Sequence, residues 1–241
     1  MLIEITGCTC TGKTKFSAQL REALGRAQVE ATSSVELAMR SMGFKWVSNP
    51  TMQNIISDIL ALGSFIFCIK KYAPFYRFAC AILFRHPDSY LGALNRLRSL
   101  NRKIGIHEFL LSRRSKGVII VDEGTVHSAH NIFAYAGFPI RNEDIRKFAQ
   151  LVPLPDIVVC LDAAPDVILS RSGSRRELPT RFEPAANMPR YIARALQVFQ
   201  GICGEERIKN RLISFNNDGS TPNAADNIIA GMITQIKNAK N

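Results

Sequence analysis

Several features that would assign the protein to particular classes are missing from its sequence. None of its six cysteines pairs with another in a CxxC motif, so we expect a reduced, cytoplasmic chain rather than a disulfide scaffold. No charged region followed by an apolar one precedes the strand-like run that starts at Leu2, so no signal peptide is expected. The most apolar stretch, residues 55–84, is interrupted by charged residues and by Pro74. No uninterrupted run in it approaches the ~20 residues of a membrane-spanning helix, so we expect it to form one or two core-facing helices.

Acidic residues are also scarce. The chain has 20 aspartates and glutamates against 31 lysines and arginines, which leaves a formal charge of +11. This excess favours anionic partners such as nucleotides, phosphorylated substrates, nucleic acid or an acidic membrane surface. Nucleic acid is not the expected partner, because the basic stretch of residues 96–116 lacks interleaved aromatic residues and belongs to no recognisable binding module. A peripheral membrane contact and a homodimer remain open.

The composition suits one large α/β domain covering residues 1–241. Hydrophobic residues make up 46% of the chain, enough for a substantial core, and no repeat, low-complexity tract or linker divides it. Short apolar runs predict strands at residues 2–6, 28–32, 117–121, 156–161 and 211–215. Helical spacing predicts helices at residues 13–25, 35–41, most of 51–115, from 165 onward, and 224–236. Strands that alternate with helices in this way indicate a doubly wound parallel sheet.

Individual residues set the expected helix ends. Gly25 is expected to cap the first helix, and Ser33 or Ser34 to begin the second. Breaks in the helical region are expected near Pro74 and Pro87, because proline disfavours a helical residue before it.

The most specific motif is the segment GCTCTGKT, which matches G-x-x-x-x-G-K-[ST] in full. A strand-like run precedes it and an amphipathic helix follows, as a phosphate-binding loop requires. We expect the loop to bind ATP with Mg²⁺ through Gly7, Cys8, Thr9, Cys10, Thr11, Gly12, Lys13 and Thr14. Lys13 should reach the β- and γ-phosphates, and Thr14 should coordinate Mg²⁺.

A pair of carboxylates, Asp122 and Glu123, follows the buried-type run GVIIV. Asp122 is expected to hold Mg²⁺, and Glu123 to act as a base on an acceptor hydroxyl or on water. The alternative is a pair of solvated charges at a strand end. Asp162 ends the next strand, so these groups and the loop should converge at the carboxyl edge of the sheet.

An arginine-rich segment, residues 171–183, is expected to form a lid over the triphosphate. Arg171, Arg175 and Arg176 would stabilise charge on the transferring group, and Arg181 lies in the same segment. The alternative is a solvated basic loop. His127 and His130 are three residues apart, but without an evident third ligand they are better read as ordinary helix positions than as a metal site.

The order of these features resembles the thymidylate kinase branch of the P-loop nucleoside and nucleotide kinases. Besides the phosphate loop, four segments carry the likeness: residues 122–137, 154–171, 171–183 and 213–220. Arg102 matches an arginine that contacts the acceptor in that family. The resemblance implies a five-stranded parallel sheet, ATP and Mg²⁺, and phosphoryl transfer to a small acceptor such as a nucleoside, a nucleotide or another hydroxyl-bearing molecule.

Two departures from the family pattern concern the acceptor. Glu123 stands where the family has an arginine, and the helical insert of about residues 40–115 begins with an unusually apolar part, residues 40–95. We therefore expect an acceptor other than thymidylate, with a hydroxyl group as the nucleophile. Two other functions stay open: a non-kinase P-loop NTPase, either a switch or a nucleic-acid-associated ATPase, and an interaction protein at a membrane surface.

Overall fold

The computed structural model describes residues 1–44, 49–85, 89–113, 117–134, 139–173, 188–219 and 223–238. Its centre is a five-stranded, all-parallel sheet with the strand order β2-β3-β1-β4-β5. The strands are β1 (Leu2–Gly7), β2 (Ala31–Ser33), β3 (Val118–Asp122), β4 (Ile157–Asp162) and β5 (Leu212–Asn216). The predicted fold class and strand number are confirmed.

Helices surround the sheet. The first five are α1 (Lys13–Arg26), α2 (Ser34–Ser41), α3 (Pro50–Cys68), α4 (Ala73–Leu83) and α5 (Tyr90–Ser112). A short π-helix, η1 (His130–Ala134), follows β3. The others are α6 (Asn142–Leu151), α7 (Pro165–Gly173), α8 (Met188–Gly204), α9 (Glu206–Lys209) and α10 (Ala224–Asn238).

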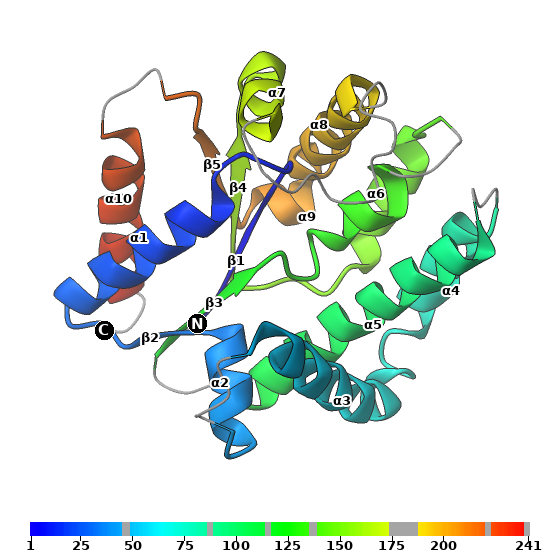
Figure 1. Ribbon diagram of the computed structural model, residues 1–241, viewed down its shortest axis with the longest axis horizontal. Helices are drawn as coiled ribbons and strands as arrows, with labels where there is room; N and C mark the ends of the chain where they lie inside the picture. The colour runs from blue at the N-terminus through cyan, green and yellow to red at the C-terminus, as the bar shows by residue number, and fades with distance from the viewer. Residues whose placement is uncertain are drawn as a thin grey trace.

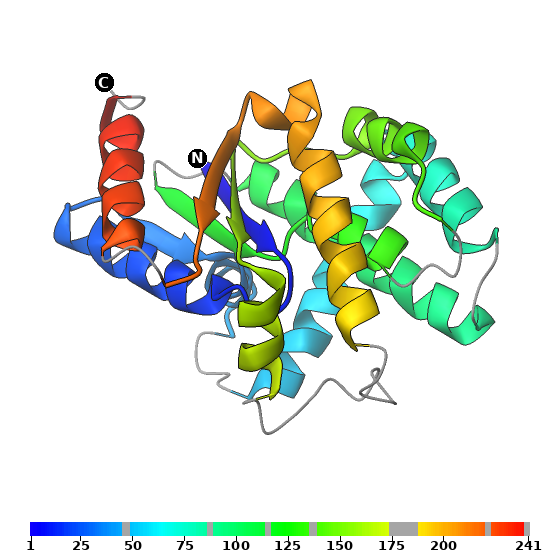
Figure 2. The ribbon, with the colours of Figure 1, turned by 90° about the horizontal axis from the view of Figure 1, so that it is seen from above.

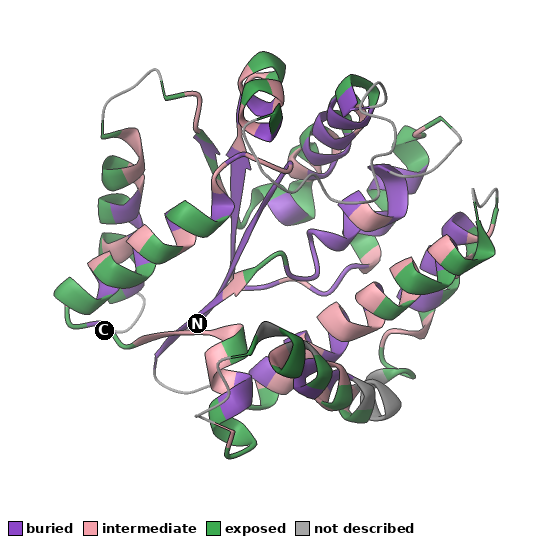
Figure 3. Cartoon of the chain, viewed as in Figure 1, coloured by how far each residue is buried: buried purple, intermediate pink, exposed green. Residues whose placement is uncertain are grey.

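The sheet is buried between two layers of helices (Figures 1 and 2). Helices α1 and α10 cover one face, where their apolar side chains pack on Ile3, Ile5 and Val159. Helices α4, α6 and α8 lie on the other face and share a second core with Val158 and Cys160. All six residues of β1 are buried, whereas the edge strands β2 and β5 are only partly buried (Figure 3). The phosphate loop therefore follows directly from a fully buried central strand.

The first helix ends differently from the prediction. It runs to Arg26 and closes with hydrogen bonds from Gln28 N to Gly25 O and from Val29 N to Leu24 O, both typical of a Schellman motif. Gln28, with φ of 59°, occupies the left-handed position that glycine usually fills. Since residues 28 and 29 are used by this cap, β2 begins only at Ala31.

The start of α2 agrees with the prediction from the sequence. Ser33 caps α2, because its Oγ accepts the backbone N–H of Glu36 at 3.1 Å. The long helical region divides into α3, α4 and α5; Pro74 lies in the first turn of α4, and Pro87 is outside the described residues.

The apolar stretch of residues 55–84 is only partly core-facing. In α4, Phe75, Phe78 and Ile82 are at most 6% exposed, as predicted. In α3, by contrast, Ile55 and Ile59 are 48% and 59% exposed, so only part of this apolar helix faces the core. Among the described residues, no helix combines the length and apolar character needed to cross a membrane.

Candidate active site

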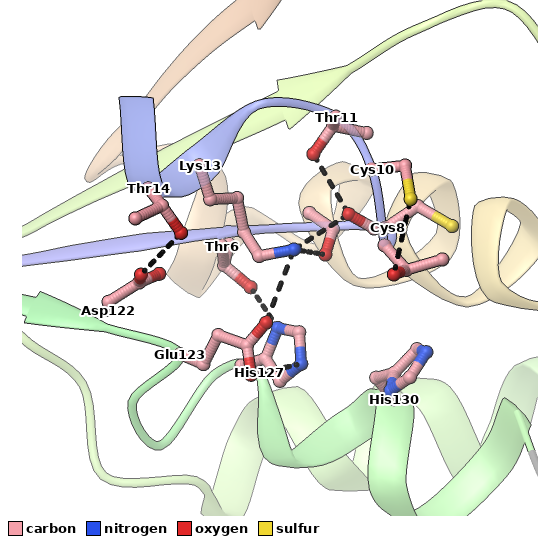
Figure 4. Close-up of polar contacts among 12 residues, drawn as sticks. Thr6, Cys8, Cys10, Thr11, Lys13, Thr14, Asp122, Glu123, His127 and His130 are labelled. Carbon is pink, nitrogen blue, oxygen red and sulfur yellow. Dashed lines mark hydrogen bonds and ion pairs between the residues drawn. The ribbon is translucent and has the colours of Figure 1, made fainter. Parts of the chain in front are cut away.

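Strand register brings the two main sequence motifs together. Ile5 of β1 pairs with Asp122 of β3, and Glu123 N donates to Ile5 O at 3.0 Å. The chain then continues from β1 through Gly7 into the phosphate loop, directly above the end of β3. Figure 4 shows the loop and the two carboxylates facing one another across this edge of the sheet.

Glycine is required at both ends of the loop. Gly7 has φ of +134°, and a Cβ there would lie 2.1 Å from Leu161 O. Gly12 has φ of +92° and precedes α1, and no side chain caps the first turn of that helix. The N–H groups that begin α1 are therefore available for an anion, and the helix dipole favours negative charge there.

Lys13 is held inside the loop. Its Nζ donates to Cys8 O at 2.7 Å and to Gly7 O at 3.2 Å, and lies 3.2 Å from Glu123 Oε1. These three contacts use all the N–H groups of the ammonium. The side chain is only 8% exposed. Because all three N–H groups are already in use, Lys13 must give up at least one of these contacts to bind a triphosphate.

The other loop residues support this arrangement. Thr11 Oγ1 donates to Cys8 O at 2.9 Å and closes the loop on itself. Cys10 has a φ of 59°. Its sulfur lies 3.8 Å from Thr9 Oγ1 and accepts a hydrogen bond from Ser172 Oγ of α7 at 3.3 Å. The loop is therefore tied to α7, the helix that leads toward the predicted lid.

Thr14 and Asp122 are neighbours, as a shared metal would require. Thr14 Oγ1 lies 3.4 Å from Asp122 Oδ2. Partial desolvation, aided by the negative charge of Glu123, raises the pKa of Asp122 above its ordinary value. Carboxylate and hydroxyl oxygens are ligands suited to Mg²⁺, and bound cations relieve the repulsion between such acids. Within the described part of the chain, no cluster of three or more His, Cys, Asp and Glu side chains could hold a metal ion.

Glu123 occupies a strained position at the end of β3. Its φ is 59°, a left-handed conformation that residues other than glycine rarely adopt and that is concentrated at functional sites. Its carboxylate faces Lys13, and its backbone carbonyl accepts a hydrogen bond from Lys103 Nζ. Partial desolvation acts to raise the pKa of Glu123, but the charges of Lys13 and Lys103 outweigh it, and the pKa lies below its ordinary value.

His127 completes a polar chain behind Glu123. Its Nδ1 lies 3.2 Å from Thr6 Oγ1, and its Nε2 lies 3.5 Å from Glu123 Oε2. Burial, assisted by the charge of Lys103, lowers the pKa of His127 well below 6.5, so the ring is neutral near pH 7. An ionised carboxylate only accepts, so the consistent tautomer carries its proton on Nε2 and accepts from Thr6. Sequence reasoning treated this histidine as an ordinary helix position and missed the contact.

A second buried group that sequence reasoning missed is Glu4, in the middle of β1. The carboxylate is 2% exposed and accepts the backbone N–H groups of His127 at 2.8 Å and Val126 at 3.1 Å. Thr125 Oγ1 lies 3.4 Å from the same carboxylate. Burial raises the pKa of Glu4, although these N–H groups and the charge of Lys103 act in the opposite direction. Glu4 therefore ties the turn after Glu123 to the central strand.

We expect Glu4→Ala to destabilise the fold by about 2–4 kcal/mol, because two buried N–H groups lose their acceptor and a void is left. Urea unfolding measures this loss. Glu22→Ala is the matched control, since Glu22 is 68% exposed and pairs with Arg26 on the surface of α1. Equal stabilities of the two variants would contradict the supporting role of Glu4.

Arg171 lies beside the phosphate loop. From α7 it donates through Nη2 to Asn217 O at 2.8 Å, and Asn217 Nδ2 donates to Thr11 O at 2.8 Å. Its other terminal nitrogen, Nη1, is buried without a hydrogen-bond partner among the described residues. Arg175, Arg176 and most of the predicted lid lie outside the described residues.

Two further predicted residues are placed nearby. Asp162 ends β4 at the same edge, where its Oδ1 accepts the N–H of the next residue, Ala163, at 2.9 Å. Arg102, on α5, lies 3.8 Å from Asp58 Oδ1 and lines a cavity together with Asp122 and Glu123. The candidate acceptor arginine and the two carboxylates thus border one space.

His130 packs beside His127, at 5.1 Å between ring centroids, and against α8. Its Nε2 contacts the hydroxyl of Tyr191, and its ring stacks on Phe199 of α8 at 5.9 Å between centroids. Burial lowers its pKa to about 4. His130 therefore belongs to the packing between η1 and α8.

The fold is that of the P-loop kinases. No family model matches the sequence, and no curated protein matches it. Among solved structures, the thymidylate kinase of Candida albicans is similar over 99% of this chain and 92% of its own, with 16% identity and a TM-score of 0.54. The shikimate kinase of Bacteroides thetaiotaomicron aligns over 98% of each chain, with 12% identity and a TM-score of 0.45. The predicted resemblance is confirmed at the level of the fold.

Proposed function

We propose that the protein is a kinase that transfers the γ-phosphoryl group of ATP to a hydroxyl group of a small acceptor. The observation that carries the proposal is the pairing of Lys13 and Thr14 with Glu123 and Asp122, at 3.2 and 3.4 Å, across the ends of β1 and β3. Ligands of open α/β sheets bind at this edge. A lysine, a hydroxyl and two carboxylates at one point supply the groups that phosphoryl transfer needs.

In this proposal the acceptor oxygen attacks the γ-phosphorus, and the bond from that phosphorus to the β–γ bridging oxygen breaks. ADP leaves with the bond's electron pair, and the hydroxyl proton passes to Glu123. Lys13 stabilises the charge on the transferring group. As Lys13 moves to the phosphates, Glu123 loses the closest positive charge that lowers its pKa, and it becomes a stronger base.

The site residues suit both ATP and Mg²⁺. The uncapped start of α1 and the positive φ angles of Gly7 and Gly12 form a cradle for phosphates. Thr14 and Asp122 would hold Mg²⁺, which neutralises phosphate charge during transfer.

The charges at the acceptor side favour a hydroxyl over a phosphate. Glu123 and Asp122 border the space where the acceptor must lie, and a phosphate dianion there would meet two carboxylates. An arginine in place of Glu123 would bind such a phosphate bidentately, whereas a glutamate repels it. A neutral alcohol has no such conflict and benefits from the base.

Arg171 is proposed to stabilise the transferring phosphoryl group, because its buried Nη1, beside the loop, has no hydrogen-bond partner among the described residues. We expect Arg171→Ala to lower kcat by about 10²-fold with a much smaller change in ATP affinity. Steady-state kinetics and nucleotide titration separate the two effects. Arg175→Ala and Arg176→Ala extend the test to the rest of the predicted lid. Full turnover in all three variants would show that these arginines have no role in phosphoryl transfer and form only a solvated face.

The deciding experiment is an acceptor screen with ATP and Mg²⁺. It compares sugars, cyclitols, lipid alcohols and nucleosides with nucleoside monophosphates, and it detects the phosphorylated product by mass. Transfer to an unphosphorylated hydroxyl compound supports the proposal. Preferential transfer to thymidine monophosphate contradicts the hydroxyl assignment, and ATP hydrolysis stimulated by nucleic acid without any phosphorylated acceptor favours an NTPase.

A further inference from the structure

A cavity of about 180 Å³ lies directly behind the two catalytic carboxylates. Strands β1 and β3 form one wall, and α2, α3 and α5 form the other. At one end it is lined by Val35 and Glu123, which are 41% and 46% exposed, so the cavity opens to solvent there. Its far end is formed by Leu2 and Pro155, near the amino ends of the strands.

We propose that this cavity is the acceptor pocket, and that it selects an uncharged alcohol whose body is a single small ring. The inference rests on the proposed function for the reaction, but it concerns binding and can be tested without turnover. Its grounds are the size of the cavity, the chemistry of its walls and the charges at its opening.

Size limits the acceptor to about one ring. An engineered protein cavity of about 150 Å³ holds one benzene molecule, so 180 Å³ accommodates a six-membered ring with small substituents. A nucleoside monophosphate consists of a base, a sugar and a phosphate group, and only one of these units fits. The acceptor is therefore expected to be smaller than a nucleotide.

The walls divide into an apolar side and a polar side. Apolar side chains form much of the lining, and they are Leu2, Val35, Ile106, Leu110, Val121 and Pro155. Ser57 of α3 and His107 of α5, each 6% exposed, bring polar groups to the interior. A ring with one apolar face and hydroxyl groups on its edge matches both sides, as small-ligand pockets commonly do.

Charge excludes an anionic acceptor. Three carboxylates line the cavity, Glu4, Asp122 and Glu123, against the two cations Arg102 and Lys103. The ammonium of Lys103 donates to the carbonyl of Glu123, and Arg102 lies 3.8 Å from Asp58. The lining therefore has no surplus of positive charge for a phosphate or carboxylate, while Glu123 at the open end can meet a hydroxyl.

The test measures binding of myo-inositol, glucose, cyclohexanol and benzyl alcohol by saturation-transfer NMR and calorimetry at millimolar concentrations, with thymidine monophosphate for comparison. Ser57→Leu fills the cavity from α3, and Val35→Phe narrows its open end at a half-exposed position that tolerates a larger side chain. Ser64→Leu is the matched control: it makes the same substitution two turns further along α3, where Ser64 does not line the cavity. Thermal melting of each variant reports whether the fold is kept.

We expect at least one ring alcohol to bind the wild type, and Ser57→Leu and Val35→Phe each to weaken it roughly tenfold or more. Ser64→Leu should bind it normally. This pattern without any phosphorylated product supports the pocket and contradicts the kinase function. Phosphorylation of an acceptor whose KM is the same in wild type, Ser57→Leu and Val35→Phe overturns the pocket and leaves the kinase function standing. The pocket is also overturned if no ring alcohol binds, or if thymidine monophosphate binds more tightly than all of them.

Discussion

Lys13→Ala should lower triphosphate turnover by at least about 10³-fold, equivalent to roughly 4 kcal/mol of transition-state stabilisation. In the resting site, Lys13 Nζ already lies within 3.2 Å of Gly7 O, Cys8 O and Glu123 Oε1, at the centre of the phosphate loop. Its charge contributes most when negative charge develops on the transferring group. Coupled-enzyme detection of ADP measures the effect.

Lys15→Ala is the matched control for this variant. Lys15 is two residues further along the same helix, but its side chain is exposed, so its removal should leave turnover within a factor of about two, as for most surface substitutions. Thermal melting checks that both variants fold. A folded Lys13→Ala protein with wild-type turnover would contradict the kinase and the NTPase functions together.

Glu123→Gln should have two opposite effects. We expect kcat for acceptor phosphorylation to fall by about 10²–10³-fold, because glutamine cannot take the hydroxyl proton. ATP binding should become about two- to fivefold tighter, since Lys13 no longer has to leave an ion pair whose strength at a half-exposed carboxylate is ~0.2–1 kcal/mol. Single-turnover kinetics and nucleotide titration measure the two quantities separately.

Glu22→Gln is the control for this substitution, because Glu22 makes a surface ion pair with Arg26 and lies on α1 away from the two carboxylates. It should change neither quantity. If Glu123→Gln phosphorylates its acceptor at the wild-type rate, Glu123 is not the base. If instead its affinity for ATP falls, Glu123 does not compete with the phosphates for Lys13.

The phosphate loop could be read from the sequence because its chemistry depends on local backbone geometry. Gly7 and Gly12 both adopt positive φ, and the N–H groups at the start of α1 are left for an anion, as the motif predicts. Strand positions in the parallel sheet were equally predictable, since β3 and β4 are continuous apolar runs before their final aspartates, and β1 is apolar apart from Glu4 and Thr6.

Helix boundaries were less predictable where tertiary contacts or an unusual cap decide them. Gln28, rather than Gly25, adopts the left-handed conformation that ends α1, and no sequence signal distinguishes it. The exposure of Ile55 and Ile59 was missed because an apolar helix pattern does not say which of its faces meets a neighbour.

The sequence by itself determined the phosphate loop, the α/β alternation and the presence of Asp122 and Glu123 at a strand end, because each depends on residues close together in the chain. Only the tertiary structure decided what those carboxylates contact. Residues 4, 13, 103 and 127 come from four different segments; parallel pairing of β1 with β3, and the position of α5 beside them, bring these residues around Glu123. A buried glutamate in a strand and a histidine in a turn show no local periodicity that reveals such partners. Their roles arise from strand register and from the desolvation that packing imposes.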